Sequence, residues 1–566
     1  MPSIAASPAI ASWLKALSAR LPRTTRWLLL FSLAVNALLL VAPLYMLQVY
    51  DSVLTSGSYD TLIWLTLIAV FLLAIYGAAE AGRRRLAAIA GQRLEAEFSE
   101  RAFHRFELCQ EPNAALPRDL ANAGRLASPF QSGTILAFVD LPFVPLFLVV
   151  LAMIHPLLGT LGLIGGAAVF ALAVMAELSN RAPSERALAV QTDTARFAEG
   201  LARQRSALVA MGLVERARDA WFAMRGTGER DTTESSRKDS IFTASSRAAR
   251  QILQISILCA GASLALNQQL SPGGIVAASI VLSRALAPID LIVGSWRSLV
   301  QARRAWSDTQ ERLGSLPRAE AVTPLPAPPA LLKLDRVSAS LPGSEVPLIR
   351  PFSAELRGGS LVALTGANGS GKTTLLQTLS GAWPIEGGKA LLGGRSIHAW
   401  PHSDRGRHIG YLPQGVELLP ATIAQNIARL SNAPPHAIIA AARAAGAHEQ
   451  ILALPDGYES RVGPGGIHLS AGQRQSLGLA RALFGSPVLL ILDEPTSNLD
   501  DLAATRVVSA IATRVAEGAI ALVATHDPRL LLRATKVLEL AERIISERAA
   551  PIATGAVSHL RKGAIA

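Results

Sequence analysis

Residues 360–381, which read SLVALTGANGSGKTTLLQTLSG, carry side chains and backbone groups suited to binding phosphate. An apolar run at 361–364 is followed by a glycine-rich loop, and the loop leads into an apolar-periodic segment. This order predicts a strand, a loop and a helix. The glycines allow successive backbone N–H groups to turn towards an anion at the helix N-terminus. Lys372 would then reach the outer phosphates and Thr373 would hold Mg²⁺. The stretch therefore predicts a nucleoside triphosphatase.

The loop matches the pattern G-x-x-x-x-G-K-[ST] at every required position. Its residues are Gly366, Ala367, Asn368, Gly369, Ser370, Gly371, Lys372, Thr373 and Thr374. A chance match within a glycine-rich turn is the alternative. The flanking strand and helix are both where the motif needs them, which favours a phosphate-binding loop.

Further polar groups follow two later apolar runs. The run at 488–492 leads to Asp493 and Glu494, and the run in AIALVATHD leads to His526. Adjacent carboxylates at a strand end can divide the work, with Asp493 holding the Mg²⁺ shell through water and Glu494 polarising the attacking water. His526 could bind the γ-phosphate. Each residue alone is more often structural, but their order behind a phosphate loop favours a hydrolytic site.

Composition indicates a membrane protein. Half of the 566 residues are apolar and 17% are charged, which is too apolar for an ordinary soluble chain. The net charge of +12 is not gathered into a basic tract interleaved with aromatic residues, so we expect no nucleic-acid partner. Cys109 and Cys259 lie far apart in the sequence, and we assign them neither a disulfide nor a metal site.

Apolar runs predict six transmembrane helices. They lie at about 27–49, 62–79, 135–154, 157–176, 252–266 and 275–293. The two long connections, after the second and fourth runs, are rich in arginine, whereas the three short connections contain no Lys or Arg. The positive-inside rule therefore places both termini, the long connections and everything after the sixth run in the cytoplasm.

Four polar residues fall within or beside these apolar runs: Asn36, Asp140, Arg284 and Asp290. Ionisable groups at membrane depth usually face a bundle interior or a water-filled cavity. Asp140 precedes Leu141 and Pro142, so we also consider that it caps a helix start. For Arg284 and Asp290 an ion pair to another helix and a cavity-lining role both stay open.

The chain divides into five segments on this basis. Residues 1–26 predict a cytoplasmic interfacial helix, because Ile10, Trp13, Leu14, Leu17 and Leu21 share one helical face. Residues 27–315 form the six-helix membrane domain, with a charged helix at 296–313 at its end. A proline-rich linker at 316–330 precedes an α/β domain at 331–551 and a tail at 552–566. The expected fold class is thus membrane α-helical plus an α/β P-loop ATPase domain.

The soluble half resembles the nucleotide-binding domain of ABC transporters. The family's motifs occur in its order: Walker A at 366–374, the Q-loop at Gln414, the signature sequence LSAGQ at 469–473, Walker B with its glutamate at 489–494, the D-loop at 497–500 and the switch histidine at His526. The resemblance implies ATP and Mg²⁺ as cofactors, with Thr373, Gln414 and Asp493 around the metal. It also implies a head-to-tail dimer, in which Ser470 and Gly472 of one copy close over ATP bound to the other.

Two positions depart from the family's pattern. Ala471 stands where the signature usually has glycine. Leu341 lies near the place of the aromatic residue that commonly stacks on adenine, so adenine would be held by apolar contact or by another residue. We expect ATP hydrolysis to survive both changes.

The membrane half resembles the exporter type of ABC protein, and more narrowly the type I secretion ATPases of the protease and lipase subgroup. The resemblance rests on LLLVAPLYMLQVYDSVLTSG at 38–57, VDLPFVPLFLVVLAMIHPLLG at 139–159 and SRALAPIDLIVGSWRSLVQAR at 283–303. It implies an exporter in the bacterial inner membrane that works as a homodimer, with an adaptor (fusion) protein and an outer-membrane channel as partners. The substrate would be a polypeptide with an uncleaved C-terminal signal. A lipid or small-molecule exporter, a catalytically silent scaffold and a heterodimer are the alternatives.

Overall fold

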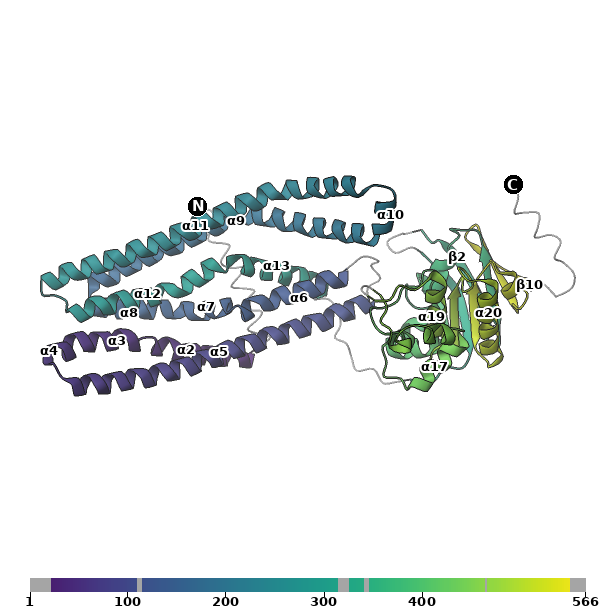
Figure 1. The fold of residues 1–566 in the computed structure, drawn as a ribbon, viewed down its shortest axis with the longest axis horizontal. Coiled ribbons are helices and arrows are strands. Elements are labelled where there is room, and N and C mark those ends of the chain that lie inside the picture. Colours follow the sequence, from purple (N-terminus) through teal and green to yellow (C-terminus); the bar gives the residue numbers. More distant parts are fainter. Residues whose placement is uncertain (1–21, 109–114, 314–324, 341–345, 464–465, 550–566) are drawn as a thin grey trace. The chain divides into compact units, whose positions relative to one another are not determined.

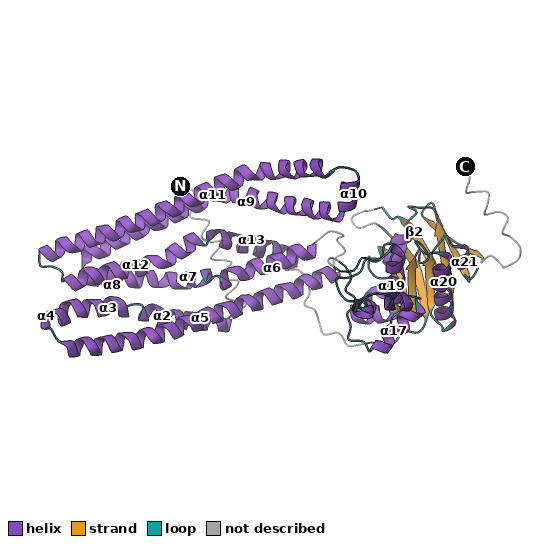
Figure 2. Cartoon of the chain, viewed as in Figure 1, coloured by secondary structure: helices purple, strands orange, loops and turns teal. Residues whose placement is uncertain are grey.

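The computed structural model describes residues 22–108, 115–313, 325–340, 346–463 and 466–549. The chain forms two units: Met1–Arg105 with Ala114–Pro317, and Phe106–Asn113 with Arg318–Ala566. The first unit is helical and the second combines strands with helices (Figure 2). The domain limits expected at 26/27, 315/316, 330/331 and 551/552 stay predictions. The face of the expected N-terminal interfacial helix, as well as Cys109 and Leu341, lies outside the described residues.

The helical unit is built from a few long helices interrupted by short ones. Its elements are α2 (Pro22–Leu38), α3 (Val41–Gln48), the π-helix η1 (Val49–Val53), α4 (Leu54–Ser56), α5 (Tyr59–Leu108), α6 (Ala115–Gln131), α7 (Thr134–Asp140), the 3₁₀ helix η2 (Leu141–Phe143), α8 (Val144–Ile154), α9 (Pro156–Arg203), α10 (Arg205–Ala210), α11 (Val214–Leu266), α12 (Pro272–Gly294) and α13 (Trp296–Leu313). The helix expected at 296–313 is confirmed as α13.

The long helices pack as antiparallel neighbours. The helices α9 and α11 lie side by side and are joined through α10 (Figure 1). The helix α12 packs against α11, α3 and α8, and a buried apolar cluster that includes Phe147, Leu151, Ile257 and Leu282 fills the space between α8, α9, α11 and α12. A second cluster, with Leu94, Phe98, Leu126 and Leu299, joins α5, α6 and α13.

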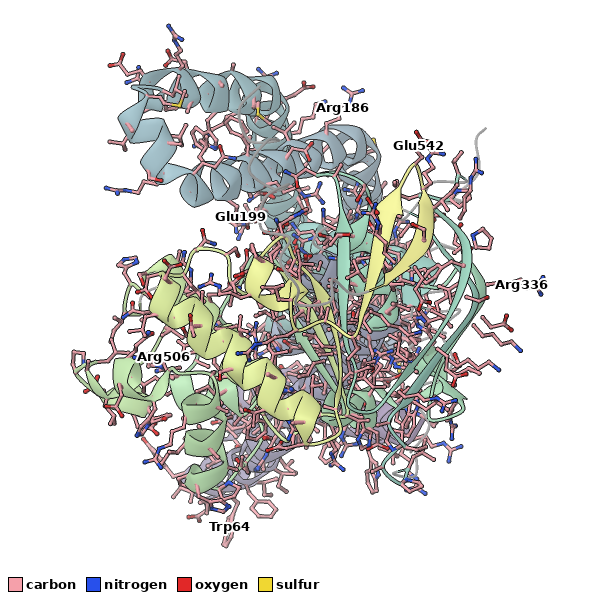
Figure 3. All side chains as sticks on the ribbon, turned by 90° about the vertical axis from the view of Figure 1, so that its right-hand side faces the viewer. Trp64, Arg186, Glu199, Arg336, Arg506 and Glu542 are labelled. Atoms are coloured by element: carbon pink, nitrogen blue, oxygen red, sulfur yellow. The ribbon has the colours of Figure 1, made fainter. Side chains whose placement is uncertain are left out.

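Five of the described helical stretches are long and apolar enough to cross a membrane. They are Pro22–Ser56, Tyr59–Leu108, Thr134–Ile154, Ser236–Leu266 and Pro272–Ile292, and a shorter apolar stretch is Pro156–Leu172. The predicted count of six therefore agrees with the structure when this shorter stretch is included. The apolar part of α5 is only 6% buried within the chain, and Trp64 extends from it (Figure 3). Such a surface requires lipid or another apolar partner.

A polar network lies where α2, α5 and α7 meet. Asn36 Nδ2 donates to Asp140 Oδ1 at 2.9 Å, and Arg83 Nη1 donates to the same oxygen at 2.6 Å. Arg83 also pairs with Glu80 at 2.6 Å and donates to Ser32 Oγ at 2.9 Å. The interpretation of Asp140 as a helix cap is wrong, because its side chain accepts no capping hydrogen bond from the turn that it precedes. The buried guanidinium of Arg83 takes this carboxylate instead.

Asp290 and Arg284 of α12 differ in environment. Asp290 Oδ2 accepts a hydrogen bond from Arg250 Nη1 of α11 at 2.5 Å, so the ion pair to another helix is confirmed for Asp290. Arg284 is exposed, and it makes no ion pair with the part of the chain that the structure describes. Cys259 of α11 is a free, exposed thiol.

The second unit contains two sheets. The strands are β1 (Leu331–Ala339), β2 (Ile349–Arg357), β3 (Leu361–Gly366), β4 (Gly387–Leu392), β5 (Arg395–Ser396), β6 (Ile409–Leu412), β7 (Leu489–Asp493), β8 (Ile520–Ala524), β9 (Lys536–Ala541) and β10 (Ile544–Ala549). An antiparallel sheet has the order β2-β1-β4-β5, and a mixed sheet has the order β10-β9-β3-β8-β7-β6. The strand expected at 409–412 is confirmed as β6.

The helices of this unit are mostly short. They are α14 (Lys372–Leu379), the 3₁₀ helix η3 (Ile397–Ala399), α15 (His402–His408), α16 (Ile423–Ile427), α17 (Pro435–Ala444), α18 (His448–Leu452), the 3₁₀ helix η4 (Gly457–Glu459), α19 (Ala471–Leu483), α20 (Asp501–Ala516) and α21 (Pro528–Leu531). One apolar cluster packs α14 and the antiparallel sheet against one face of the mixed sheet. Another packs α16, α17, α19 and α20 against its other face.

Two local features interrupt the regular pairing of strands. Arg336 has a φ of +47° where the pairing of β1 with β2 shifts register, and its exposed side chain extends outward from β1 (Figure 3). This is a β-bulge. Ala541 of β9 pairs with Ile544 of β10, and Glu542 and Arg543 link them. Both linking residues have positive φ, and Figure 3 shows Glu542 at this hairpin tip. A two-residue hairpin of this kind is a type I′ turn.

Candidate active site

The central strands of the mixed sheet bring the predicted chemical groups to one edge. Strands β3, β8, β7 and β6 are parallel, and the register pairs Leu364 with Ala524 and Ala524 with Asp493. The carboxyl ends of parallel strands meet at the same sheet edge. The phosphate loop after β3, the pair Asp493–Glu494 after β7 and the segment with His526 after β8 therefore share that edge.

The loop between β3 and α14 depends on glycine at two positions. Gly366 has a φ of +152°, and a Cβ there would lie 2.4 Å from the carbonyl oxygen of Leu540. Gly371, the N-cap of α14, has a φ of +108°, and a Cβ there would lie 2.9 Å from Leu348 Cδ2. Backbone conformations of this kind are open to glycine and costly for other residues. The loop can therefore turn its N–H groups inward before α14 begins.

Two side chains of the loop are poised for an anion. Lys372 is 8% exposed, and its Nζ donates to the carbonyl oxygens of Gly366 at 2.6 Å and Ala367 at 3.0 Å. The hydroxyl oxygen of Ser370 is buried and has no hydrogen-bond partner among the described residues. A buried hydroxyl without a partner is costly. A phosphate oxygen in the loop would give both Lys372 and Ser370 a charge-assisted partner.

Thr373 and Asp493 are already in contact. Thr373 Oγ1 donates to Asp493 Oδ2 at 2.7 Å, and Asp493 is 1% exposed. Burial raises the pKa of Asp493, and the negative charge of Glu494 raises it further, while the hydrogen bond from Thr373 and the charge of Lys372 oppose the shift. A hydroxyl and a carboxylate beside a phosphate loop are the oxygen ligands that Mg²⁺ takes together with nucleotide phosphates. The residues present therefore fit Mg²⁺-ATP.

Tyr411 of β6 lies on the same face of the sheet as Asp493. It pairs in register with Ile491, two residues before Asp493, and side chains two residues apart share a face. Burial raises the pKa of Tyr411 to about 12, and the charge of Asp493 contributes to the shift. The hydroxyl therefore stays protonated over the physiological range.

Glu494 has an unusual backbone conformation for a residue with a side chain. Its φ is +48°, in the left-handed region. Its N–H donates to the carbonyl oxygen of Ala524 at 2.9 Å, and its own carbonyl oxygen accepts from Ser497 N at 3.1 Å and Ser497 Oγ at 2.8 Å. Non-glycine residues in this region cost of order 1–3 kcal/mol and persist where neighbouring structure enforces them, often at functional sites. The side chain of Glu494 is half-buried.

The structure does not bring every predicted residue into contact. Gln414 follows β6 and His526 follows β8, and both are exposed. Neither side chain makes a hydrogen bond or ion pair within the described ranges. Both side chains are therefore accessible to a ligand at this sheet edge.

The signature residues begin the helix α19. Ser470 is its N-cap: Ser470 Oγ accepts from Gln473 N at 3.1 Å, and Ser470 N donates to Gln473 Oε1 at 2.8 Å. This reciprocal capping box leaves the side chains of Ser470 and Ala471 exposed. Gly472 is half-buried, and a Cβ there would lie 3.3 Å from the carbonyl oxygen of Asn498. The helix start, with its free N–H groups, is thus available to an anion.

One buried residue near the site was missed by the sequence reasoning. Gln475 lies within the run LSAGQRQ but received no role, and its side chain bonds to the backbone at Glu494. The signal in the sequence is a glutamine on the apolar face of an amphipathic helix, next to Ser476 and Leu477, which are also buried. Burial of a polar side chain at such a position calls for hydrogen-bond partners.

Comparison with known proteins decides the family. Residues 349–497 match the family model for the ABC transporter. The type I secretion system ATP-binding protein PrsD of Rhizobium meliloti is 37% identical over 524 residues, which cover 90% of this chain and 88% of that protein. The chain belongs to the ABC transporter family. This confirms the resemblance found in the sequence.

Other relatives of this ABC transporter show its exporter character. An ATP-dependent lipid A-core flippase of Chromobacterium violaceum is 36% identical over 230 residues, or 40% of this chain and 39% of the flippase. The solved structure described as a bacterial Atm1-family ABC exporter with ATP bound shares the fold, with a TM-score of 0.77 at 18% identity over 94% of this chain and 96% of that one. The protein is thus an ABC exporter with several membrane-spanning helices, an ATP-binding domain and ATP hydrolysis coupled to transport.

Proposed function

We propose that this ABC exporter is the inner-membrane ATPase of a type I secretion machine and moves a polypeptide with a C-terminal signal out of the cytosol. The observation that carries the proposal is the extent of the similarity to PrsD, which spans 90% of the chain and so includes the membrane half. The similarity to the lipid A-core flippase covers 40% of the chain. The membrane half is the part that must distinguish one cargo from another, since both relatives are described by their use of ATP: PrsD is an ATP-binding protein and the flippase is ATP-dependent.

In this proposal the chain works as a homodimer with two composite ATP sites. Residues 366–374 bind the phosphates of ATP, with Lys372 leaving its two loop carbonyls for the outer phosphates. Ser470 and Gly472 of the second copy supply the other side of the site, because a helix N-terminus favours the γ-phosphate. This accounts for the exposure of Ser470 in a single copy of the chain, where no second copy covers it.

The proposed chemistry divides between three groups. Thr373, Asp493 and Gln414 hold Mg²⁺, which neutralises charge on the β- and γ-phosphates when it is bound. Glu494 polarises the attacking water as general base, and His526 positions the γ-phosphate. The accessible side chains of Gln414 and His526 support these roles, because both follow strands that end at the phosphate loop's edge of the sheet.

The proposed partners complete a path from the cytosol to the exterior. An inner-membrane adaptor (fusion) protein and an outer-membrane channel would receive the polypeptide, and both termini and the ATPase domain would lie in the cytoplasm. The arginine-rich segments between the second and third and between the fourth and fifth apolar runs support this orientation.

The proposal is tested by deleting the gene and restoring it as the wild type or as Glu494→Gln. We expect the deletion strain to lose at least one secreted polypeptide from the medium. The wild type should restore it, and Glu494→Gln, which keeps the size of the side chain but removes the base, should not. An unchanged set of secreted polypeptides, together with altered lipids in the outer leaflet, would favour the lipid exporter suggested by the flippase similarity.

A further inference from the structure

Gln475 contacts the backbone at Glu494 from another element. This glutamine lies on α19 and is 3% exposed. Its Nε2 lies 3.3 Å from the carbonyl oxygen of Glu494 and 3.3 Å from that of Pro495. An amide nitrogen has two hydrogens to donate, so two carbonyl oxygens use its donor capacity fully.

The Glu494 peptide needs such support because of its conformation. With a φ of +48°, Glu494 occupies a region that residues with a Cβ rarely adopt, and neighbouring contacts must hold it there. Three elements do so: β8 through the carbonyl of Ala524, the turn after β7 through Ser497, and α19 through Gln475. The direction of the Glu494 side chain follows from this backbone conformation.

The contact from α19 differs from the other two in what it connects. Ala524 and Ser497 belong to the sheet edge that carries Glu494 itself. Gln475 instead belongs to the helix whose N-cap is Ser470, with one helical turn and a half between them. A helix with its buried face packed in the core moves as one body, so a displacement of Ser470 is carried to Gln475.

We propose that Gln475 is a positioning residue that holds the Glu494 peptide in its productive conformation and links it to the signature helix of the same domain. The inference rests on the proposed composite site. In a head-to-tail dimer, Ser470 of one domain closes over the nucleotide of its partner, while Glu494 of that domain serves its own nucleotide. Gln475 therefore connects the two composite sites of the dimer through a single domain.

The test compares two matched glutamine-to-methionine substitutions in the full-length protein. Gln475→Met keeps the length of the side chain and removes both donors. Gln425→Met, the control, removes a glutamine from the capping box of α16, where its Oε1 accepts from Thr422 N at 3.0 Å, and leaves Glu494 untouched. Steady-state ATP hydrolysis and thermal unfolding are measured for each variant. Retention of labelled ATP is measured after Glu494→Gln has been added to each of them.

The expected result is a lower kcat with intact nucleotide binding. Gln475→Met should reduce kcat about three- to tenfold, as expected for hydrogen bonds lost at the reacting site, while the KM for ATP and ATP retention change less than about twofold. Gln425→Met should keep the wild-type kcat. A wild-type kcat for Gln475→Met, or a fall in ATP retention that matches the fall in kcat, would overturn the inference.

A second variant covers the case in which Gln475→Met does not fold. Gln475→Glu keeps the shape but places a carboxylate against two carbonyl oxygens, and protonation of that carboxylate restores one donor. Its kcat relative to the wild type should therefore rise as pH falls, whereas a flat ratio contradicts the positioning role. Absence of hydrolysis in the wild type itself would instead refute the proposed function.

Discussion

Replacement of Asp119 by asparagine should destabilise the helical unit much more than the same replacement at Asp308. Asp119 of α6 pairs with Arg105 of α5 at 3.2 Å and with Arg312 of α13 at 3.3 Å. Asp308 of α13 pairs with Arg118 of α6 at 2.6 Å. Both carboxylates thus join α6 to α13. They differ in exposure, because the Asp119 side chain is 2% exposed and that of Asp308 is 39% exposed.

The expected loss of stability for each variant follows from this difference in burial. Removal of one member of a buried ion pair costs about 3–5 kcal/mol, since the remaining buried charge loses the attraction that offset its desolvation. Arg312 is 18% exposed and asparagine still accepts a hydrogen bond, so we expect about 3 kcal/mol for Asp119→Asn. The exposed pair is worth about 0–1 kcal/mol. At roughly 2 °C per kcal/mol for a unit of this size, Tm should fall by about 6 °C against at most about 2 °C.

Thermal unfolding of the full-length protein in detergent, followed by tryptophan fluorescence, measures both variants. Trp306 of α13 is a local reporter, because its ring lies 5.7 Å from that of Phe98 of α5 in an edge-to-face arrangement. Equal shifts for Asp119→Asn and Asp308→Asn would refute the reasoning. The triple variant Asp119→Leu, Arg105→Met and Arg312→Met should recover most of the lost stability, since apolar packing then replaces the two ion pairs of Asp119.

Two further predictions concern the ATPase domain. Gly371→Ala should weaken ATP binding of the full-length protein about tenfold or more, because the φ of +108° at Gly371 and the nearby Leu348 side chain both oppose a Cβ. The control in the nucleotide titration is Gly394→Ala, since Gly394 also has a positive φ but a Cβ there would meet nothing within 4 Å. Burial tends to raise the pKa of Asp527, but hydrogen bonds from Arg529 outweigh it and hold that pKa below its usual range. The carboxylate of Asp527 therefore contributes about 1 kcal/mol to the free energy of unfolding above the pKa that it has in the unfolded chain. This contribution is lost as pH falls through the pKa of the folded state, so the Tm difference between Asp527→Asn and the wild type should vanish in acid.

Local sequence patterns predicted elements that have a distinct composition and a clear end. The strand at 409–412 was found with its bounds as a short apolar run before Pro413, and the helix at 296–313 as a charged, helix-compatible stretch before a proline-rich linker. The phosphate loop was found because its glycines are required by the backbone itself. In both cases the information lies within about twenty residues of chain.

Asp140 shows where such patterns fail. Its neighbours Leu141 and Pro142 indicate a helix start, and a cap was a reasonable local interpretation. The carboxylate instead accepts hydrogen bonds from Asn36 and Arg83, which are 104 and 57 residues away in sequence. A buried arginine outcompetes a local N–H group for a carboxylate, because an unpaired buried charge is far more costly than an uncapped turn.

At Glu494, too, some features follow from the local sequence and others from contacts with distant residues. Sequence order places an acidic pair at the end of β7, but the left-handed conformation of Glu494 and the three contacts that hold it arise only once β8 and α19 have packed around that strand. The proposed general base can therefore be named from a motif, whereas the orientation of its side chain depends on tertiary contacts. Because one of those contacts comes from the helix that begins at Ser470, the groups proposed to close a nucleotide site and the group proposed to hydrolyse ATP are parts of one packed body. Substitutions on the buried face of α19 should accordingly alter hydrolysis without touching ATP.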